Sequence, residues 1–486
     1  MNIIVLFPID LYEDISYIKN KTVFLVEEEL YFNRSSKKLG SMKFNVLKPV
    51  YHRATMKAYY DYLKSKKIKV SYIDLNDNWV SKIKKIYNEK KDELEFYDPS
   101  DRYLLKKISS NFKNSFIVDT PRFILTSDDM KEYTGALRQT SFYSWMRKKY
   151  NILMKKDKYI GGKLTYDNEN RQQPYKGIEK DISKDILYTN NKYIKDAFKY
   201  IKKTIPYTHL YVWNSKLKDI NSLSETELEI RFPVTISGAK TVLKKFIKTK
   251  LDNFGKYQDI ILDTEHSLIY HAGISPMLNI GLLTPINVIN EVVKVLKSNN
   301  QNLNSVEGFV RQILGWREFC RYTYEHHSSK YLNKNHFNSK NKLHKKWYNG
   351  TTKLDPVNLC IEKAFRFGYL HHIERLMIMA NSMVLSNIHP TEMYKWFTEF
   401  SLDSYDWVME YNIYSMGSYA DGGVFTSKPY ISSSNYVIKM SNYTKRNGWY
   451  SIWDKLFWLF MKNHRTKIKK IQRLSMLLKH IDKNLK

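Results

Sequence analysis

The stretch Gly368-Tyr-Leu-His-His-Ile-Glu-Arg-Leu-Met377 decides how the second half of the chain is interpreted. If it forms a helix, His371 and His372 stand four and three residues before Arg375, so all three side chains share one side. Two adjacent imidazoles on a core-facing helix are costly to bury unless polar groups contact them. Taken alone, the stretch favours a pair of hydrogen-bonded core histidines over a functional site.

The residues after this stretch change that balance. Aromatic rings, an apolar-flanked carboxylate and a glycine turn come in Trp396-Phe397, Leu402-Asp-Ser-Tyr-Asp-Trp407, Ala420-Asp-Gly-Gly423 and Ser427-Lys-Pro-Tyr430. Such a mixture suits a large planar cofactor with a polar edge better than it suits a plain helical core.

The charge of the chain points to a polyanionic partner. The 486 residues include 80 Lys and Arg against 49 Asp and Glu, a net charge of +31. A surplus of this size attracts nucleic acid through the release of counterions. Part of it is also explained by the heavy use of Lys, Asn, Ile and Tyr that an AT-rich genome produces. With 43% hydrophobic and 15% aromatic residues, the composition excludes a disordered chain.

Cysteine usage and hydropathy predict an intracellular, soluble protein. Cys320 and Cys360 are the only cysteines, so no disulfide framework and no four-thiolate metal site is expected. The start, Met1 to Phe7, lacks a basic segment and meets Asp10 too soon for a signal peptide. No apolar run reaches the length of about 18 residues that a membrane span needs.

The first part of the chain predicts a parallel α/β domain over residues 1–130. Ile3 to Phe7, Thr22 to Val26 and Ile68 to Ile73 are short, β-branched apolar runs, and Ala54 to Lys64 between the last two has a helical pattern. Strand, helix and strand at this spacing are typical of a Rossmann-like sheet.

The rest of the chain predicts a helical domain. Residues 131–205 are turn-rich and polar, and we interpret them as a connecting segment. Residues 206–486 show one helical pattern after another. Within them Gln312, Trp316 and Cys320 recur every four residues, which predicts a single stripe along one helix.

Several unusual motifs occur in order along nearly the whole chain. They are Phe142-Tyr-Ser-Trp-Met-Arg147, Asn151-Ile-Leu-Met154, Gly161-Gly162 with Asp167-Asn-Glu-Asn-Arg171, Phe254-Gly-Lys-Tyr-Gln-Asp259, Arg311-Gln-Ile-Leu-Gly-Trp-Arg-Glu-Phe319, His371-His372 and Tyr419-Ala-Asp-Gly-Gly423 to Tyr430. Together they resemble the photolyase/cryptochrome family, in the prokaryotic branch whose members often carry an iron–sulfur cluster. The resemblance implies an α/β domain that can hold an antenna chromophore, followed by a larger all-α domain that binds FAD.

By this resemblance, His271 to Gly281 looks like the family's phosphate-cradling turn, where backbone N–H groups at a helix start suit a pyrophosphate. An ordinary helix cap is the alternative that the stretch alone would favour. Asp403 looks like the carboxylate beside the flavin ring, paired with Arg375. The cofactor-binding residues implied are His271, Ser275, Asn279, Arg311, Gln312, Trp316, Arg375, Asp403, Tyr405 and Met409.

The resemblance also implies a path for electrons and a pocket for the substrate. Trp396 is similar to the aromatic residue through which electrons reach the flavin, with Trp347 or Tyr348 as the outer one, while Phe397 stands where relatives place Tyr. The residues implied on the substrate side are His371, His372 and Tyr430 as catalytic groups and Asp259 as a carboxylate able to hold a cation.

The chain departs from the family pattern at three further places. Thr444 to Trp449 hold no cysteine where relatives with a cluster place several, so we expect no iron–sulfur cluster. Met409 stands where relatives carry Glu or Asn, and a thioether cannot donate a hydrogen bond. Val26 replaces a cysteine near the antenna, which leaves antenna binding open.

These features predict a monomeric DNA photolyase that binds UV-damaged DNA and repairs it with light through FAD. A histidine pair suits proton transfer in the repair of (6-4) photoproducts, although the sequence also permits repair of cyclobutane dimers. A cryptochrome-like blue-light photoreceptor without repair activity is the alternative. A nucleic-acid-binding protein with a degenerate flavin site is a third interpretation.

Overall fold

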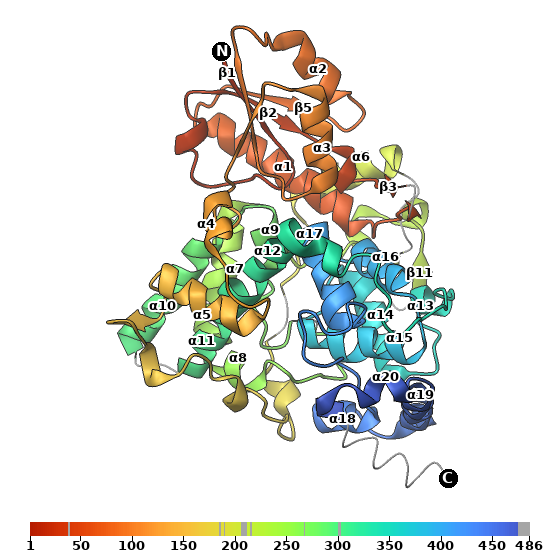
Figure 1. Cartoon of the computed structure of the whole chain (residues 1–486). Coiled ribbons are helices and arrows are strands. Elements are labelled where there is room, and N and C mark those ends of the chain that lie inside the picture. The colour runs from red at the N-terminus through yellow and green to blue at the C-terminus, as the bar shows by residue number, and fades with distance from the viewer. Residues whose placement is uncertain are drawn as a thin grey trace.

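The chain folds into an α/β domain and a helical domain, which lie at the top and bottom of Figure 1. In the computed structural model, the described residues are 1–36, 39–183, 186–188, 190–205, 211–213, 216–266, 268–299 and 303–474. The boundary predicted at residue 206 falls on 206–210, outside the described residues.

The α/β domain is built on a parallel sheet in the order β5-β2-β1-β6-β7. Its strands are β1 (Asn2–Leu6), β2 (Thr22–Val26), β5 (Val70–Ile73), β6 (Glu93–Tyr97) and β7 (Phe116–Val118), and its helices are α1 (Leu47–Ser65), α2 (Trp79–Ile86) and α3 (Arg102–Asn111). The three predicted strands and the predicted helix are confirmed. This strand order, which runs outward from β1 in both directions, is that of a doubly wound fold.

The segment that we predicted as a connection contributes to both domains. It contains α5 (Gln139–Lys149) and α6 (Lys192–Thr204), with α4 (Ser127–Glu132) just before it. Helix α5 packs on the helical domain through Phe142 and Met146, whereas α6 lies along α1 and buries Ile194 and Ile201. The basic helical pattern that the sequence shows from Ser183 to Lys203 is confirmed by α6, whereas the turn-rich composition of the segment hid α5.

The helical domain is formed mainly by the helices that follow residue 235. Its helices are α7 (Ile236–Thr249), α8 (Leu251–Tyr257), α9 (Ser275–Asn279), α10 (Pro285–Asn299), α11 (Leu303–Arg311), η8 (Gln312–Arg317), α12 (Glu318–His327), α13 (Lys346–Asn349), α14 (Asp355–Phe367), η10 (Glu374–Ala380), α15 (Asn381–Leu385), α16 (Pro390–Phe400), α17 (Asp406–Glu410), η11 (Tyr411–Gly417), α18 (Ser434–Lys439), α19 (Trp449–Asn463) and α20 (Arg465–Lys469). Short ribbons pair β3 (Ser35–Ser36) with β4 (Gly40–Ser41), β8 (Met154–Lys155) with β9 (Lys158–Tyr159), and β10 (Tyr211–Trp213) with β11 (Lys216–Lys218). In the part of the chain that the structure describes, no helix has the length and apolar character to cross a membrane.

Three of these segments, η8, η10 and η11, are π-helical turns that continue directly into or out of α-helices. A π-turn inserts an extra residue and rotates the next helical residues about the axis, and such turns are common at functional sites. The predicted stripe of Gln312, Trp316 and Cys320 is therefore wrong. Gln312 and Trp316 are half-buried on one side, whereas Cys320 is fully buried in the core.

Two arginines of the α/β domain hold helix α17 of the helical domain. Arg34 donates two hydrogen bonds to Asp406, the second at 2.7 Å, and Arg102 donates to both oxygens of Glu410 at 2.6 and 3.1 Å. Both carboxylates are buried. Bidentate pairs of this kind fix orientation as well as distance, so the α/β domain sets the position of α17.

Replacing Arg34 by Ala should lower the free energy of unfolding by about 3–5 kcal/mol, because Asp406 is left buried without its cation. Urea denaturation followed by tryptophan fluorescence measures the change. The matched control is Lys240→Ala, which removes an exposed pair with Glu13 at 2.6 Å between the same domains and should cost about 0–1 kcal/mol. Equal effects of the two substitutions would contradict the assignment.

Candidate functional site

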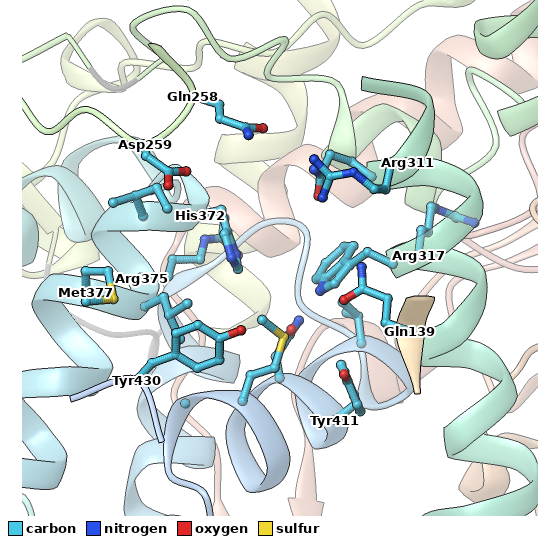
Figure 2. A pocket seen from close by; sticks show the side chains of 18 of the residues that line it. Gln139, Gln258, Asp259, Arg311, Arg317, His372, Arg375, Met377, Tyr411 and Tyr430 are labelled. Atoms are coloured by element: carbon cyan, nitrogen blue, oxygen red, sulfur yellow. The ribbon is translucent and has the colours of Figure 1, made fainter. Parts of the chain in front are cut away.

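A cavity of about 1030 Å³ opens within the helical domain. Its wall is formed by side chains of α5, α9, η8, η10, α17 and η11 and of the loop that ends at Tyr430. Figure 2 shows Asp259, His372, Arg375 and Tyr430 on one side of it and Gln139, Arg311 and Arg317 on the other. A volume of this size accommodates a large organic ligand.

An ion pair between Arg375 and Asp403 forms one wall. Asp403 accepts hydrogen bonds from both Nη atoms of Arg375, at 2.9 and 3.1 Å, from Ser275 Oγ at 2.6 Å, and from the Ser401 hydroxyl. Burial alone would raise the pKa of Asp403, but the charge of Arg375 and these hydrogen bonds lower it below its usual value. The carboxylate is therefore ionised, and its oxygens are fully occupied by the protein.

The turn that carries Asp403 is held from several directions. Asn279 Nδ2 donates to the Asp403 carbonyl at 2.9 Å, Arg317 donates to Asn279 Oδ1 at 3.3 Å, and Lys48 of the α/β domain donates to the Ser404 carbonyl at 2.8 Å. Gly368 is required beside it, because a Cβ there would lie 1.8 Å from Leu402 Cδ1 and its φ is +62°. The Asn279 amide thus connects the turn at Asp403 with Arg317, one through each end.

The histidine pair is divided between the cavity and the core. His372 and Arg375 line the cavity, whereas His371 is fully buried and its ring stacks on that of His271 at 4.7 Å between centroids. The prediction that all three side chains share one side of a helix is wrong at His371. This residue precedes the helix, and its carbonyl accepts the N–H of Arg375 at 3.1 Å.

Both imidazoles are neutral near pH 7. Burial, followed by the charge of Arg375, lowers the pKa of His372 to about 4. Burial, with Lys363 next in importance, brings the pKa of His371 well below its usual value. The Nε2 atom of His371 lies 3.5 Å from Glu374, whose carboxylate is paired with Lys363.

The rim of the cavity carries a cluster of charges that includes residues of both sides. Arg311 Nη2 donates to Asp167 at 3.1 Å, and Arg171 Nε lies 4.0 Å from Asp259. Burial raises the pKa of Asp259 to about 6. Among the described residues, no group of three or more His, Cys, Asp or Glu is arranged to hold a metal ion. The cation expected at Asp259 stays a prediction.

The structure brings nearly all predicted cofactor-binding residues to the cavity. Those on its wall are His271, Ser275, Asn279, Arg311, Gln312, Trp316, Arg375, Asp403 and Met409. Tyr405 is different, because its ring lies against Tyr31 and His52 of the α/β domain. Tyr405 is the residue directly before α17, and it is not among the described residues that line the cavity.

Sequence reasoning missed Asn412, which lines the cavity three residues after Met409. Its Oδ1 atom has no hydrogen-bond partner among the described residues. The spacing of three residues on one helical segment would have indicated it. It also missed Gln139 on α5, a helix distant in the chain, and Arg317, the residue after the predicted Trp316.

An aromatic path leads from the cavity toward the surface. Phe397 lines the cavity, Trp396 lies behind it at 5.0 Å between ring centroids, and Phe365 comes next at 6.1 Å from Trp396. Tyr348 lies 6.2 Å beyond Phe365, and the Trp396 indole donates to the Trp347 carbonyl at 2.8 Å. The predicted electron-transfer residues are thus neighbours, connected through two phenylalanines.

Comparison with known proteins shows the class of protein that this fold and cavity define. The family model described as deoxyribodipyrimidine photo-lyase-related protein matches residues 4–209. A (6-4) photolyase from Agrobacterium fabrum is 30% identical over 366 residues, which cover 73% of this chain and 69% of that protein. The chain belongs to the photolyase/cryptochrome family.

Two solved structures confirm the predicted fold of a parallel α/β region followed by a mostly helical domain. A bacterial class III photolyase from Agrobacterium tumefaciens superimposes with a TM-score of 0.53 at 15% identity, covering 90% of this chain and 86% of that one. A cryptochrome from Synechocystis sp. PCC6803 gives 0.55 at 12% identity, covering 97% and 91%.

The buried His371 should make stability depend on pH. Its folded-state pKa is lowered, so the unfolded chain binds a proton below about pH 6.5 that the folded protein does not. Stability from this group is present at pH 7 and is lost as the pH falls. His371→Gln should reduce the loss of unfolding free energy between pH 7 and pH 5 by about 2 kcal/mol, measured by urea denaturation at both values. Parallel pH profiles for wild type and variant would show that His371 is not held neutral.

Proposed function

We propose that this protein is a DNA photolyase, which binds FAD in the cavity and uses blue light to repair UV-induced pyrimidine dimers, with (6-4) photoproducts favoured. The observation that carries the proposal is that His372, Tyr430 and the Arg375–Asp403 pair line the same cavity, although they come from separate segments. The similarity to a protein named (6-4) photolyase supports it.

The residues of the cavity fit FAD. Its wall offers buried polar atoms without a hydrogen-bond partner among the described residues, namely His271 Nε2, Trp316 Nε1, Trp407 Nε1 and Asn412 Oδ1. Buried polar groups are normally paired, so a ligand with a polar edge would complete them. When bound and reduced, FAD supplies an electron on absorbing blue light. Arg375 and Asp403 would lie beside it as fixed, opposite charges.

His372 would act on the substrate as a proton donor or relay. It lines the cavity together with Tyr430, and its imidazole is neutral because burial and then the charge of Arg375 lower its pKa to about 4. The phosphate of a bound lesion would raise its pKa and bring it toward the range in which it can transfer a proton.

Damaged DNA would be held by the positive charge at the mouth of the cavity. Arg138, Arg171, Arg311 and Lys428 line it, and the chain carries a net charge of +31. Cations attract the phosphate backbone, and a lesion that stacks poorly costs least to flip out of the duplex. Asp167 and Asp259 on the same rim partly offset the charges of Arg171 and Arg311. We therefore expect Arg138 and Lys428 to contribute most of the attraction for DNA at this rim.

A cryptochrome-like photoreceptor is the second candidate, and one feature favours it. The Met409 thioether lines the cavity from α17 in place of a hydrogen-bonding Glu or Asn, so redox states of a bound flavin would be stabilised differently. Duplexes that carry one (6-4) photoproduct or one cyclobutane dimer, assayed separately under blue light, distinguish the two functions. Light-dependent reduction of bound FAD without repair of either duplex would favour the photoreceptor.

His372→Ala should keep FAD bound and reducible by light but lose repair of (6-4) photoproducts by about a hundredfold or more, because the proton donor is removed. Repair under single-turnover conditions measures the loss, and His326→Ala, on α12 outside the cavity lining, is the matched control. If repair persists in His372→Ala, the role assigned to this residue is wrong. If FAD is lost as well, the histidine is structural.

Trp396→Phe should leave FAD binding intact and remove most of its light-driven reduction, because the indole behind Phe397 is replaced by a ring that is much harder to oxidise. Absorbance during illumination with an added reductant tracks the reaction. Trp458→Phe on α19 is the matched control and should behave as wild type. Unchanged reduction in Trp396→Phe would mean that electrons take another route.

A further inference from the structure

A second, smaller cavity lies beside the main one. It has a volume of about 410 Å³ and is lined by His336, Tyr419, Gly422, Ser427, Lys467, Lys470, Ile471 and Gln472. Ser427 lines both cavities. The helix α20 that contributes Lys467 lies at the lower end of the molecule in Figure 1, far from α2.

The lining of this second cavity is positively charged. Lys467 and Lys470 contribute ammonium groups, and no carboxylate is found among the described residues of the wall. The Lys467 ammonium donates to the His336 carbonyl. Burial, and then the charges of these two lysines, lower the pKa of His336, so its ring is neutral near pH 7. Both lysines therefore lie close to the imidazole, and all three side chains line the same cavity.

The loop that separates the cavities is built to approach His336 closely. The His336 N–H donates to the Ala420 carbonyl at 3.1 Å, and a Cβ on Gly422, where φ is +71°, would come within 2.8 Å of His336 Nδ1. Asp421 is turned inward, since its carboxylate accepts the backbone N–H groups of Gly423 and Phe425 at 2.9 and 3.3 Å. The acidic residue of the loop is therefore occupied, and the wall of the pocket keeps its positive charge.

The imidazole has one nitrogen that no group satisfies. His336 Nε2 is buried and has no hydrogen-bond partner among the described residues. In the tautomer protonated at Nε2, the imidazole would form, with the Ser427 hydroxyl and the two ammonium groups, a set of donors of the kind that binds a phosphate. A buried polar atom without a partner is unusual in a folded protein and indicates a ligand that hydrogen-bonds to it.

We propose that this second cavity binds one phosphodiester group of the damaged strand, next to the nucleotides that enter the main cavity. The inference rests on the proposed function, because it deepens the recognition of the same DNA. Inorganic phosphate offers the same chemistry, but the shared Ser427 places the pocket directly beside the substrate cavity, where a continuous strand would pass. Lys467, Lys470 and His336 would then hold the backbone while the lesion lies flipped out.

The first experiment compares charge-loss variants. Lys470→Gln and the double variant Lys467→Gln/Lys470→Gln are tested against Lys85→Gln, an exposed lysine on α2. Binding to a duplex with one (6-4) photoproduct is measured by fluorescence anisotropy at several salt concentrations. The double variant should bind about tenfold more weakly at low salt, and its log–log salt slope should be smaller by about one. Lys85→Gln should match wild type.

The second experiment uses the wild-type protein, so it does not depend on a variant that folds. Each phosphate beside the lesion is replaced in turn by a neutral methylphosphonate. One position should weaken binding to wild type, and the same replacement should have little further effect on the double variant. A scan in which no position distinguishes the two proteins overturns the proposal.

The remaining outcomes separate this inference from the proposed function. If wild type does not bind the damaged duplex, both fail. If it binds and the double variant binds equally well with the same salt slope, only the phosphodiester site is wrong. The last outcome uses inorganic phosphate at constant ionic strength. If phosphate raises the melting temperature of wild type but not of the double variant, and both bind DNA equally well, the pocket is a site for free anions. That result overturns the proposal.

Discussion

The buried ion pair between Arg375 and Asp403 is the interaction on which the rest of the site depends. A carboxylate at this depth is stable only if its charge is paired and its oxygens are hydrogen-bonded, since desolvation of an unpaired charge costs several kcal/mol. Arg375, Ser275 and Ser401 meet both requirements. The pair also joins η10, α9 and the turn before α17, so satisfying one charge brings three parts of the cavity wall together.

The α/β domain supports this arrangement, although the strands of its sheet do not line the cavity. Lys48 supports the turn after Asp403, and Arg34 and Arg102 hold the two ends of α17 through Asp406 and Glu410. Helix α17 in turn presents Met409 to the cavity. The domain interface is therefore part of the site's geometry, and the two domains act as one structural unit around the cavity.

Local pattern predicted the elements whose cause is local. The apolar runs at Ile3 to Phe7 and Thr22 to Val26 predicted strands because a parallel strand buried on both faces is continuously apolar. Strand β6 was missed because Glu93-Leu-Glu-Phe-Tyr97 reads as polar. Its Glu95 is nonetheless buried, and it is neutralised by Lys21 at 2.6 Å, a contact between residues far apart in the chain.

The sequence by itself determined the two-part architecture, the family and most of the residue types that surround the cavity, because these depend on periodicity and on motifs that are continuous in the chain. Only the tertiary structure decided which side chains reach the cavity. The π-turn of η8 moved Cys320 into the core, the position of His371 before its helix turned it toward His271, and packing against Tyr31 and His52 holds the Tyr405 ring at the α/β domain. Each outcome depends on how a helix begins or is interrupted and on which distant segment packs against it. A pattern along one segment contains no record of those contacts.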